Sequence, residues 1–398
     1  MSDWHDATLR DEIELAYGKA LPAHKRSEGS VEVFGSNGVV GTNATGLLEG
    51  PGIVVGRKGS VGAVVYSESS YWPIDTAYYV VNKKNHNWRY LYYLLQSSGL
   101  SGMNSHSAVP GLNRDDVYSL SVRIPNREIQ DKIARVLDLL GESVDTERSL
   151  LETTRRLKEA VAFTLFSQGM RQAKLRESEI GPIPEEWDLV PMGTLGKIGN
   201  GSTPKRSNPL YWNGGTFPWL TSAKVYDREI VAANELVTKA ALDECHLPIV
   251  RPGAVLVAIT GQGKTLGNCA VLRVDATINQ HIAYLQTDTE QADPGFVRGY
   301  LETRYEYLRQ VGSGGGSTKG ALTCAFLRGM SIPLPPLPEQ HDIVAVLDAI
   351  DAKVDLHVRH LEVLEAIRGS ITTQLVSGAL TLEDLDLTVL GVSEEKAA

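Results

Sequence analysis

Residues 258 to 265 read A-I-T-G-Q-G-K-T, which is close to a sequence that binds nucleotide phosphates. In a phosphate-binding loop a glycine-rich turn ends in Lys and Ser or Thr, and the following helix holds the phosphates at its N-terminus. Here the first position is Ala258 where the pattern requires Gly, and Cys269–Leu272 is typical of a strand. We interpret the segment as a glycine loop that lets the backbone approach a phosphate group, with Lys264 adding charge. The alternative, nucleotide hydrolysis at Lys264, predicts ATPase activity in the purified chain.

Two shorter segments resemble parts of other catalytic motifs. Asn208–Tyr211 reads N-P-L-Y and lacks the second proline of the Asn-Pro-Pro-Tyr motif of adenine methyltransferases. No strand, glycine-rich turn and helix upstream of it form a pattern that binds the methyl donor. Asp351–Lys353 reads D-A-K, half of a nuclease metal site, within a helical pattern that favours a solvated helix face. Neither segment predicts catalysis by this chain.

Both halves of the chain contain clusters of basic, amide and other polar side chains. Arg and Lys bond guanine edges or phosphates, and Asn and Gln bond adenine edges, each good bidentate contact discriminating by ~1–3 kcal/mol. The alternative for each residue is a solvated surface group. The candidates for nucleic-acid contact are Lys19, Lys25, Arg26, Asn37, Arg57, Lys58, Ser60, His106 and Arg114 in the first half, and Lys205, Arg206, Lys224, Lys264, Asn279, Gln280, His281, Ser317, Thr318 and Lys319 in the second. Gly312–Ser317 reads as a flexible loop, either a linker or a loop that approaches DNA.

A proline-rich segment followed by a long helix organises the C-terminal part of the chain. Prolines fix φ and remove a backbone donor, so we expect Pro333–Pro338 to be extended and a helix to begin at Glu339. Three-and-four spacing of apolar residues predicts a long amphipathic helix with coiled-coil character. The apolar positions are 343, 346, 347, 350, 354, 358, 361, 364, 367, 371 and 375.

The same pattern occurs earlier in the chain. A shift of 210 residues places Pro125 on Pro335 and Gln130 on Gln340, and it continues to Ser167 on Ser377. A period this long indicates a duplicated domain, because solenoid repeats run about 20 to 50 residues. The first long helix is expected from residue 125 to about 171. We expect antiparallel packing of the two helices, which gives the chain pseudo-two-fold symmetry.

Each long helix follows a globular α/β module. In the first module, strands are expected at Val31–Phe34, Ile53–Val55, Ala63–Tyr66 and Ala77–Val81, and a helix at about Trp88–Gln96. The second module repeats this outline, with a helix at about Pro294–Val311. Tyr211, Trp212 and Trp219 are expected in its core, and the alternative for them is stacking on bases. The predicted domains are residues 1–124, 125–180, 185–333, 334–380 and an acidic tail, 381–398.

Composition limits the class of protein. The chain has 398 residues, is 42% apolar and carries a net charge of −9. Residues 334–398 hold 4 basic and 12 acidic residues, while residues 1–124 hold 11 and 12, and 185–333 hold 14 and 14. Both modules are therefore close to neutral and can carry local basic patches. Three dispersed cysteines predict neither disulfides nor zinc, and no run of ~18 apolar residues predicts a membrane span. We expect a soluble cytoplasmic protein.

The chain resembles the specificity subunit of type I restriction-modification systems. The resemblance is carried by Pro335–Gln340 followed by Leu347-Asp348, by Gly52–Ser60, and by Gly201–Pro204 with Tyr211–Gly215. It implies an α+β fold in which two target recognition domains are separated by two long helices packed as an antiparallel coiled coil. It also implies no catalysis in this chain, and one module reading each half of a split, asymmetric sequence in double-stranded DNA.

The resemblance further implies two adenine methyltransferase subunits docked on the helices, with translocating endonuclease subunits able to join. S-adenosylmethionine, and ATP with Mg²⁺ where an endonuclease joins, would then bind the partners. Candidate partner contacts are Pro335, Pro336, Leu337, Pro338, Glu339 and Gln340. A helix of about 37 residues spans roughly 55 Å, which suits half-sites one to two duplex turns apart. The alternative is a duplicated protein-binding scaffold with no role at DNA.

Overall fold

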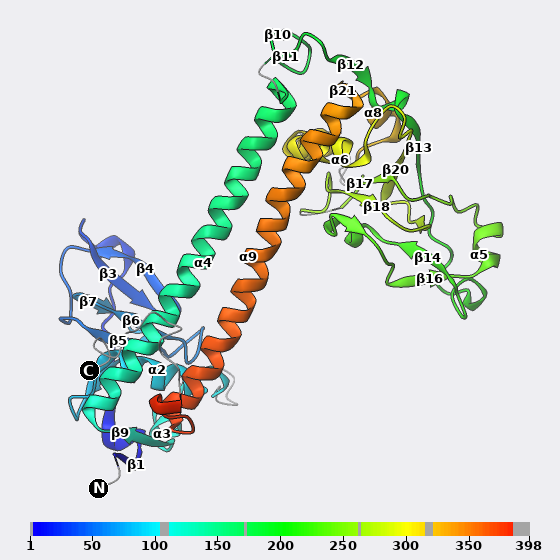
Figure 1. Cartoon of the computed structure of the whole chain (residues 1–398). Helices are drawn as coiled ribbons and strands as arrows, with labels where there is room; N and C mark the ends of the chain where they lie inside the picture. Colours follow the sequence, from blue (N-terminus) through cyan, green and yellow to red (C-terminus); the bar gives the residue numbers. More distant parts are fainter. Residues whose placement is uncertain (1–2, 104–110, 171–172, 262–263, 315–320, 385–398) are drawn as a thin grey trace. The chain divides into compact units, whose positions relative to one another are not determined.

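The computed structural model describes residues 3–103, 111–170, 173–261, 264–314 and 321–384. The contacts divide the chain into two compact units. The first unit contains residues 1–149 and 357–398, and the second contains residues 150–356. Each unit holds one globular module and part of each long helix, α4 (Arg127–Gln168) and α9 (Leu337–Ser377) (Figure 1).

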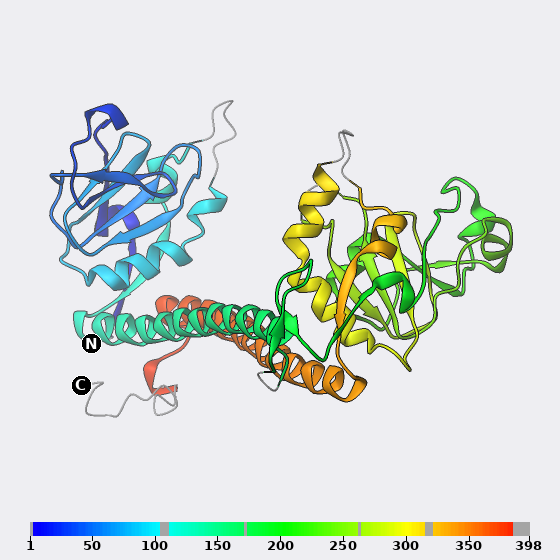
Figure 2. The ribbon, with the colours of Figure 1, turned by 90° about the horizontal axis from the view of Figure 1, so that it is seen from above.

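Within the described residues, the module of the first unit contains two main sheets, a separate pair of strands and several helices. Its larger sheet has the order β2-β8-β5-β6 with antiparallel neighbours, and its smaller sheet has the order β4-β3-β7 with β3 parallel to β7. Figure 2 shows α2 (Trp88–Ser97) between the strands of this module and α4. The strands are β1 (Trp4–Thr8), β2 (Ile13–Tyr17), β3 (Val31–Gly35), β4 (Gly38–Asn43), β5 (Gly52–Gly56), β6 (Val64–Ser67), β7 (Tyr71–Pro73), β8 (Ala77–Asn82) and β9 (Ser121–Pro125).

The module of the second unit repeats this plan. Its larger sheet has the order β13-β20-β17-β18-β15, and its smaller sheet, β16-β14-β19, again has one parallel pair, β14 with β19. Helix α6 (Pro294–Thr303) takes the place of α2, and the β12–β21 pair that of β1–β9. The strands are β12 (Asp188–Pro191), β13 (Gly196–Asn200), β14 (Phe217–Leu220), β15 (Glu229–Ile230), β16 (Glu235–Val237), β17 (Ala254–Ala258), β18 (Cys269–Leu272), β19 (Thr277–Ile278), β20 (Ile282–Thr287) and β21 (Ser331–Leu334).

The duplication predicted from the sequence is confirmed by this common topology. The 210-residue shift places β9 on β21 and the start of α3 (Arg114–Tyr118) on the start of α8 (Cys324–Gly329). The strands and the helix expected in the first module are present within one or two residues of their predicted limits.

Helices α4 and α9 pack side by side and run in opposite directions within each unit. In the first unit, Ile133 to Leu140 of α4 share a core with Leu375 and Val376, near the end of α9. In the second unit, Phe166, near the end of α4, shares a core with Ile343 and Leu347, near the start of α9. The antiparallel coiled coil expected from the apolar spacing is therefore confirmed.

Three local predictions are wrong. Helix α9 begins at Leu337 and not at Glu339, because a proline such as Pro338 is tolerated in the first turn, where its missing N–H has no partner in the helix. The helix expected at residues 294–311 is broken at Arg304 into α6 and α7 (Tyr305–Ser313). The expected loop from Gly312 therefore starts two residues late, and residues 315–320 lie outside the described part of the chain.

A buried glutamine at the start of each long helix fixes the adjacent module. Gln130 donates to the carbonyl of Pro125 (2.9 Å) and accepts from the backbone N–H of Asn87 (2.9 Å). Gln340 donates to the carbonyl of Pro335 (2.8 Å) and accepts from the backbone N–H of Asp293 (2.8 Å). Since Asn87 and Asp293 are the N-cap residues of α2 and α6, each glutamine holds the end of a module helix.

Candidate nucleic-acid interface

A three-residue turn joins the two sheets of each module. The inter-sheet turn is residues 74–76 in the first module, between β7 and β8, and residues 279–281 in the second, between β19 and β20. Its backbone hydrogen bonds are the same in both: Ala77 N donates to Ile74 O, and Ile282 N donates to Asn279 O. Arg57 follows β5, and its backbone N–H donates to the carbonyl of Thr76 at 3.0 Å. Ile259 follows β17 and donates in the same way to the carbonyl of His281, also at 3.0 Å. The two turns therefore place different side chains on the same backbone.

In the second module the turn carries a chain of hydrogen-bonded polar side chains. Thr203 donates its hydroxyl to Gln280 Oε1, Gln280 Nε2 lies 3.2 Å from His281 Nε2, and His281 Nδ1 lies 2.5 Å from Thr260 Oγ1. Gln280 is exposed, whereas Asn279 is only 5% exposed and its side chain accepts from His281 N. The predicted contact residues Asn279, Gln280 and His281 thus lie together in one turn. Asn279 is buried, so its side chain supports the turn and does not face solvent.

In the first module a pair of arginines lies beside the turn. The Arg57 guanidinium stacks 5.2 Å from the Tyr17 ring and donates to the carbonyl of Asp75, and the Arg114 guanidinium lies 4.6 Å from the same ring. The ring centroids of Tyr78 and Tyr17 are 5.2 Å apart. Burial raises the pKa of the Tyr78 hydroxyl. Stacking on tyrosine holds a guanidinium rigidly while its remaining N–H groups stay available to phosphate or guanine.

The other candidates of the first module lie on its loops. Lys58 and Ser60 are exposed in the turn after β5, and Asn37 is exposed in the β3–β4 turn. Lys19 and Lys25 are exposed, while Arg26 donates to the carbonyls of Leu21 and Val40. His106, like Ser317, Thr318 and Lys319 of the second module, lies outside the described residues.

The remaining candidates of the second module are partly occupied by contacts within the chain. Arg206 pairs with Glu235 and lies 4.0 Å above the Trp212 ring, and Lys224 pairs with Asp227. Lys205 is exposed. Trp219 is buried with Tyr211 and Trp212 packed against it, so the expected core role of these aromatic residues is confirmed.

The loop at Lys264 lies between two strands. It joins β17 to the antiparallel strand β18, so the strand expected after the loop is confirmed and no helix there can hold phosphates at its N-terminus. Lys264 itself is exposed, and its carbonyl accepts from the Tyr305 hydroxyl at 2.6 Å. In the segment N-P-L-Y, which resembles a methyltransferase motif, the Asn208 side chain caps a short 3-10 helix and accepts a hydrogen bond from Leu210 N.

Sequence reasoning missed several members of these groups. Asp75 and Thr76 occupy the turn of the first module, Tyr17 and Tyr78 support its arginines, and Thr203 and Thr260 orient the turn of the second. The correspondence of the two modules is seen in the structure, where the bridge between Lys58 and Gly111 matches the bridge between Thr260 and Ala321. Matching by topology, unlike the 210-residue shift, brings the two turns into register.

The proline-rich partner candidates divide into exposed and buried residues. Pro336 and Pro338 are exposed and Leu337 is half-buried, so these side chains can reach another protein. Gln340 is fully buried, Pro335 is buried, and Glu339 accepts from the Trp187 indole (3.2 Å) and the Met170 amide (3.0 Å). The side chains of Gln340 and Pro335 are buried and their hydrogen bonds are made within this unit, and the partner contact of the segment stays a prediction.

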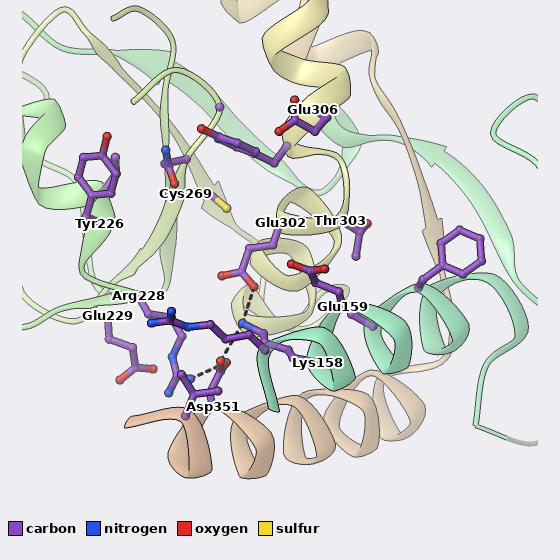
Figure 3. A pocket seen from close by; sticks show the side chains of 18 of the residues that line it. Lys158, Glu159, Tyr226, Arg228, Glu229, Cys269, Glu302, Thr303, Glu306 and Asp351 are labelled. Atoms are coloured by element: carbon purple, nitrogen blue, oxygen red, sulfur yellow. Dashed lines mark hydrogen bonds and ion pairs between the residues drawn. The ribbon is translucent and has the colours of Figure 1, made fainter. Parts of the chain in front are cut away.

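Asp351 is part of a buried ion-pair network, so the prediction of a solvated helix face is wrong for it. It is 6% exposed, and its carboxylate lies 2.7 Å from Lys158 Nζ and 2.5 Å from Arg228 Nη1 (Figure 3). Lys158 also pairs with Glu302 of α6 at 3.1 Å. Position 351 lies four residues after Leu347, so it faces the module and not water.

This network lines a cleft of about 1050 Å³ in the second unit. Cys269 also lines the cleft, and burial raises the pKa of its thiol, which favours the neutral form. Across the described residues, no three His, Cys, Asp or Glu side chains are arranged to hold a metal ion. Within the same part of the chain, every helix is too short or too polar to cross a bilayer.

Comparison with known proteins decides the family. Residues 1–154 and 184–366 match the family model described as "Type I restriction modification DNA specificity domain". The chain belongs to this family. The resemblance noted in the sequence is therefore confirmed, and the two matched specificity domains correspond to the two copies of the repeat.

Relatives of the specificity-domain family match most of the chain. A putative type I restriction enzyme MjaX specificity subunit from Methanocaldococcus jannaschii is 26% identical over 76% of this chain and 70% of its own length. The EcoR124I/EcoR124II specificity subunit of Escherichia coli is 24% identical over 56% of this chain and 52% of its own length.

A solved structure shows the same fold. The crystal structure of the type I restriction-modification S subunit from M. genitalium superposes with a TM-score of 0.61 at 17% identity, and covers 94% of this chain and 96% of that one. A chain from a structure titled as the basis of complex assembly and conformational transition of the type I system has a TM-score of 0.62 at 17% identity, covering 96% and 99%. The α+β fold with paired long helices is thus the fold that this chain has in common with the solved S subunit structure.

Proposed function

We propose that this chain is the DNA-recognition subunit of a type I restriction-modification complex and that each module reads one half of a bipartite, asymmetric site. The observation that carries the proposal is the repeated inter-sheet turn. Both modules present polar side chains from the same backbone position, with Asp75 in one and Gln280 in the other. Two readers with one geometry and different chemistry suit two half-sites of different sequence.

We infer that the chain itself performs no catalysis and that methylation and cleavage occur on partner subunits. S-adenosylmethionine would then bind two adenine methyltransferase subunits, and ATP with Mg²⁺ would bind an endonuclease subunit where one joins. The strand after the Lys264 loop and the capping role of Asn208 support this division of labour. ATP hydrolysis by the purified chain would contradict it.

The long helices offer the surface for these partners. Phe163 is 69% exposed on α4 in the second unit, and Val363 is 56% exposed on α9 in the first. Aromatic side chains are enriched in the cores of protein interfaces, so Phe163 is a candidate contact for a partner. Pro336 and Pro338, at the start of α9, are further exposed candidates in the second unit. Charge substitutions at Phe163 should weaken methyltransferase binding, which co-purification measures, and leave the fold unchanged by circular dichroism.

Module exchange tests the assignment of half-sites. Replacing residues 185–333 with the corresponding module of a related subunit should change one half of the methylated sequence and leave the other half as it was. Single-molecule sequencing of methylated adenines in a host that carries the chain and its methyltransferase partner gives the answer. A change in both halves would contradict the one-module, one-half-site assignment, and unchanged methylation would favour a scaffold with no role at DNA.

A further binding property follows from the near-neutral modules. Few basic residues mean few phosphate contacts, so we expect the isolated chain to bind DNA weakly and the methyltransferase subunits to complete a clamp around the duplex. Gel shifts with and without the partner should show at least a tenfold gain in affinity. Tight, site-specific binding by the chain alone would contradict the need for a clamp.

A further inference from the structure

We propose that the inter-sheet turns carry the base-reading side chains, with Gln280 reading an adenine in one half-site and Asp75 reading a cytosine in the other. The inference deepens the proposed function and rests on it. It begins from the position that the two residues share. Each is the exposed middle residue of its turn, held by the same backbone hydrogen bonds between the two sheets of its module.

The contacts of Gln280 fix the direction of its amide. The amide nitrogen can only donate, so at 3.2 Å it donates to His281 Nε2, which must then accept. The other ring nitrogen, Nδ1, therefore carries the hydrogen and donates to Thr260 Oγ1. At the other end of the chain, Thr203 donates its hydroxyl to Gln280 Oε1. The amide is held from both sides.

The groups left free on Gln280 match one base. After these contacts the amide of this exposed residue retains one N–H and one oxygen lone pair. Adenine presents an acceptor at N7 and a donor at N6 on its major-groove edge, and this is the pair that a glutamine amide bonds with both of its atoms. A solvated surface glutamine has no need of such fixation, and holding a flexible side chain costs rotamer entropy.

The corresponding side chain in the first module is that of Asp75, which differs from glutamine in its hydrogen-bonding groups. The Asp75 carboxylate only accepts, and it has no hydrogen-bond or ion-pair partner among the described residues. The N4 amino group of cytosine is the donor that carboxylates bond in the major groove. Arg57, which donates to the Asp75 carbonyl and stacks on Tyr17, stands beside the turn to contact phosphate or the neighbouring guanine.

The test uses the full chain in complex with its methyltransferase subunits, and reads the methylated motif by single-molecule sequencing. Gln280→Ala should remove the preference for adenine at one position of one half-site and leave the other half unchanged. Thr203→Val should relax the same position to a smaller extent, because it frees the amide to rotate. Asp75→Ala should relax one cytosine in the opposite half-site. Gln291→Ala, at an exposed glutamine three residues before α6, is the matched control and should leave the motif intact.

If a variant complex methylates too little DNA for sequencing, competition binding with duplexes substituted at each position replaces it. Discrimination at the A·T pair should then fall roughly 5- to 150-fold for Gln280→Ala and stay unchanged elsewhere. A motif unaffected by Gln280→Ala, or one relaxed throughout a half-site, would overturn this inference alone. A wild-type complex that methylates no bipartite site would instead overturn the proposed function.

Discussion

The two modules share a backbone topology and differ in the polar groups that hold each module to the long helices. In the first unit, Arg89 of α2 pairs with Asp138 of α4, with both side chains about one-third exposed. In the second unit, Asp351 of α9 is buried between Lys158 and Arg228, with Arg298 at 3.9 Å. The two units thus share the glutamine at the start of each helix, whereas the buried network around Asp351 belongs to the second unit.

Each module is therefore held to its part of the long helices by its own set of ion pairs. A buried charge is tolerated only with its partners, so a module placed on the wrong helix segment would leave charges unpaired. The polar network therefore restricts which module fits which helix pair, while the shared glutamine contact sets the position of the module helix in both. Lys158 and Asp351 lie outside residues 185–333, so exchange of that segment should succeed when the incoming module has basic side chains that can pair with Asp351, as Arg228 does here.

The largest effect should come from breaking the buried network. Asp351→Ala removes the carboxylate that neutralises Lys158 and Arg228, and we expect a loss of about 3 kcal/mol in the stability of the second unit. Asp138→Ala in the first unit should cost about 1 kcal/mol, because that pair is partly solvated and screened. Native-state hydrogen exchange reports each unit separately.

A matched control distinguishes burial from charge. Asp348→Ala removes a carboxylate from the same helix, but its side chain is 52% exposed, so the change should stay within about 0.5 kcal/mol. Equal losses for the substitutions at 348 and 351 would mean that the network contributes through the net charge of the helix and not through its buried geometry.

The second prediction concerns what the modules share. Gln340→Ala leaves the Asp293 N–H and the Pro335 carbonyl without partners, and Gln130→Ala does the same to Asn87 and Pro125. Because the contacts match, we expect each substitution to destabilise its own unit by about 2 kcal/mol. Unit-resolved hydrogen exchange measures both. A cost at one glutamine and none at the other would show that the two contacts have diverged in energy despite their common geometry.

The sequence predicted the elements better than it predicted the side-chain environments. Apolar spacing sufficed for the long helices, and the 210-residue shift was enough to pair Gln130 with Gln340. The inter-sheet turn of the first module was missed because its residues, I-D-T, share no type with N-Q-H and lie 205 residues before them. Asp351 was misjudged because its charge suggested solvent, although its place on the apolar stripe indicated burial.

The smallest effect should come from a pair at which the two copies of the repeat meet. Glu147 and His357 occupy the same position of the 210-residue repeat, and Glu147 Oε1 lies 2.6 Å from His357 Nδ1 in the first unit. In antiparallel helices related by a two-fold axis, a residue on the axis faces its own equivalent. Pairing of like copies from two chains would oppose Glu to Glu and His to His, so the divergence at this position favours pairing within one chain.

A double-mutant cycle tests this reading. Glu147→His or His357→Glu alone should destabilise the first unit by about 1 kcal/mol, and the double exchange should recover most of that loss, since it restores an unlike pair. His360→Ala is the control: His360 lies 3.6 Å from the same carboxylate but its side chain is 58% exposed, so the effect should stay below about 0.5 kcal/mol. Additive losses in the double exchange would mean that the pair fills space at the axis without selecting which copies associate, whereas recovery would identify it as a determinant of pairing between unlike halves.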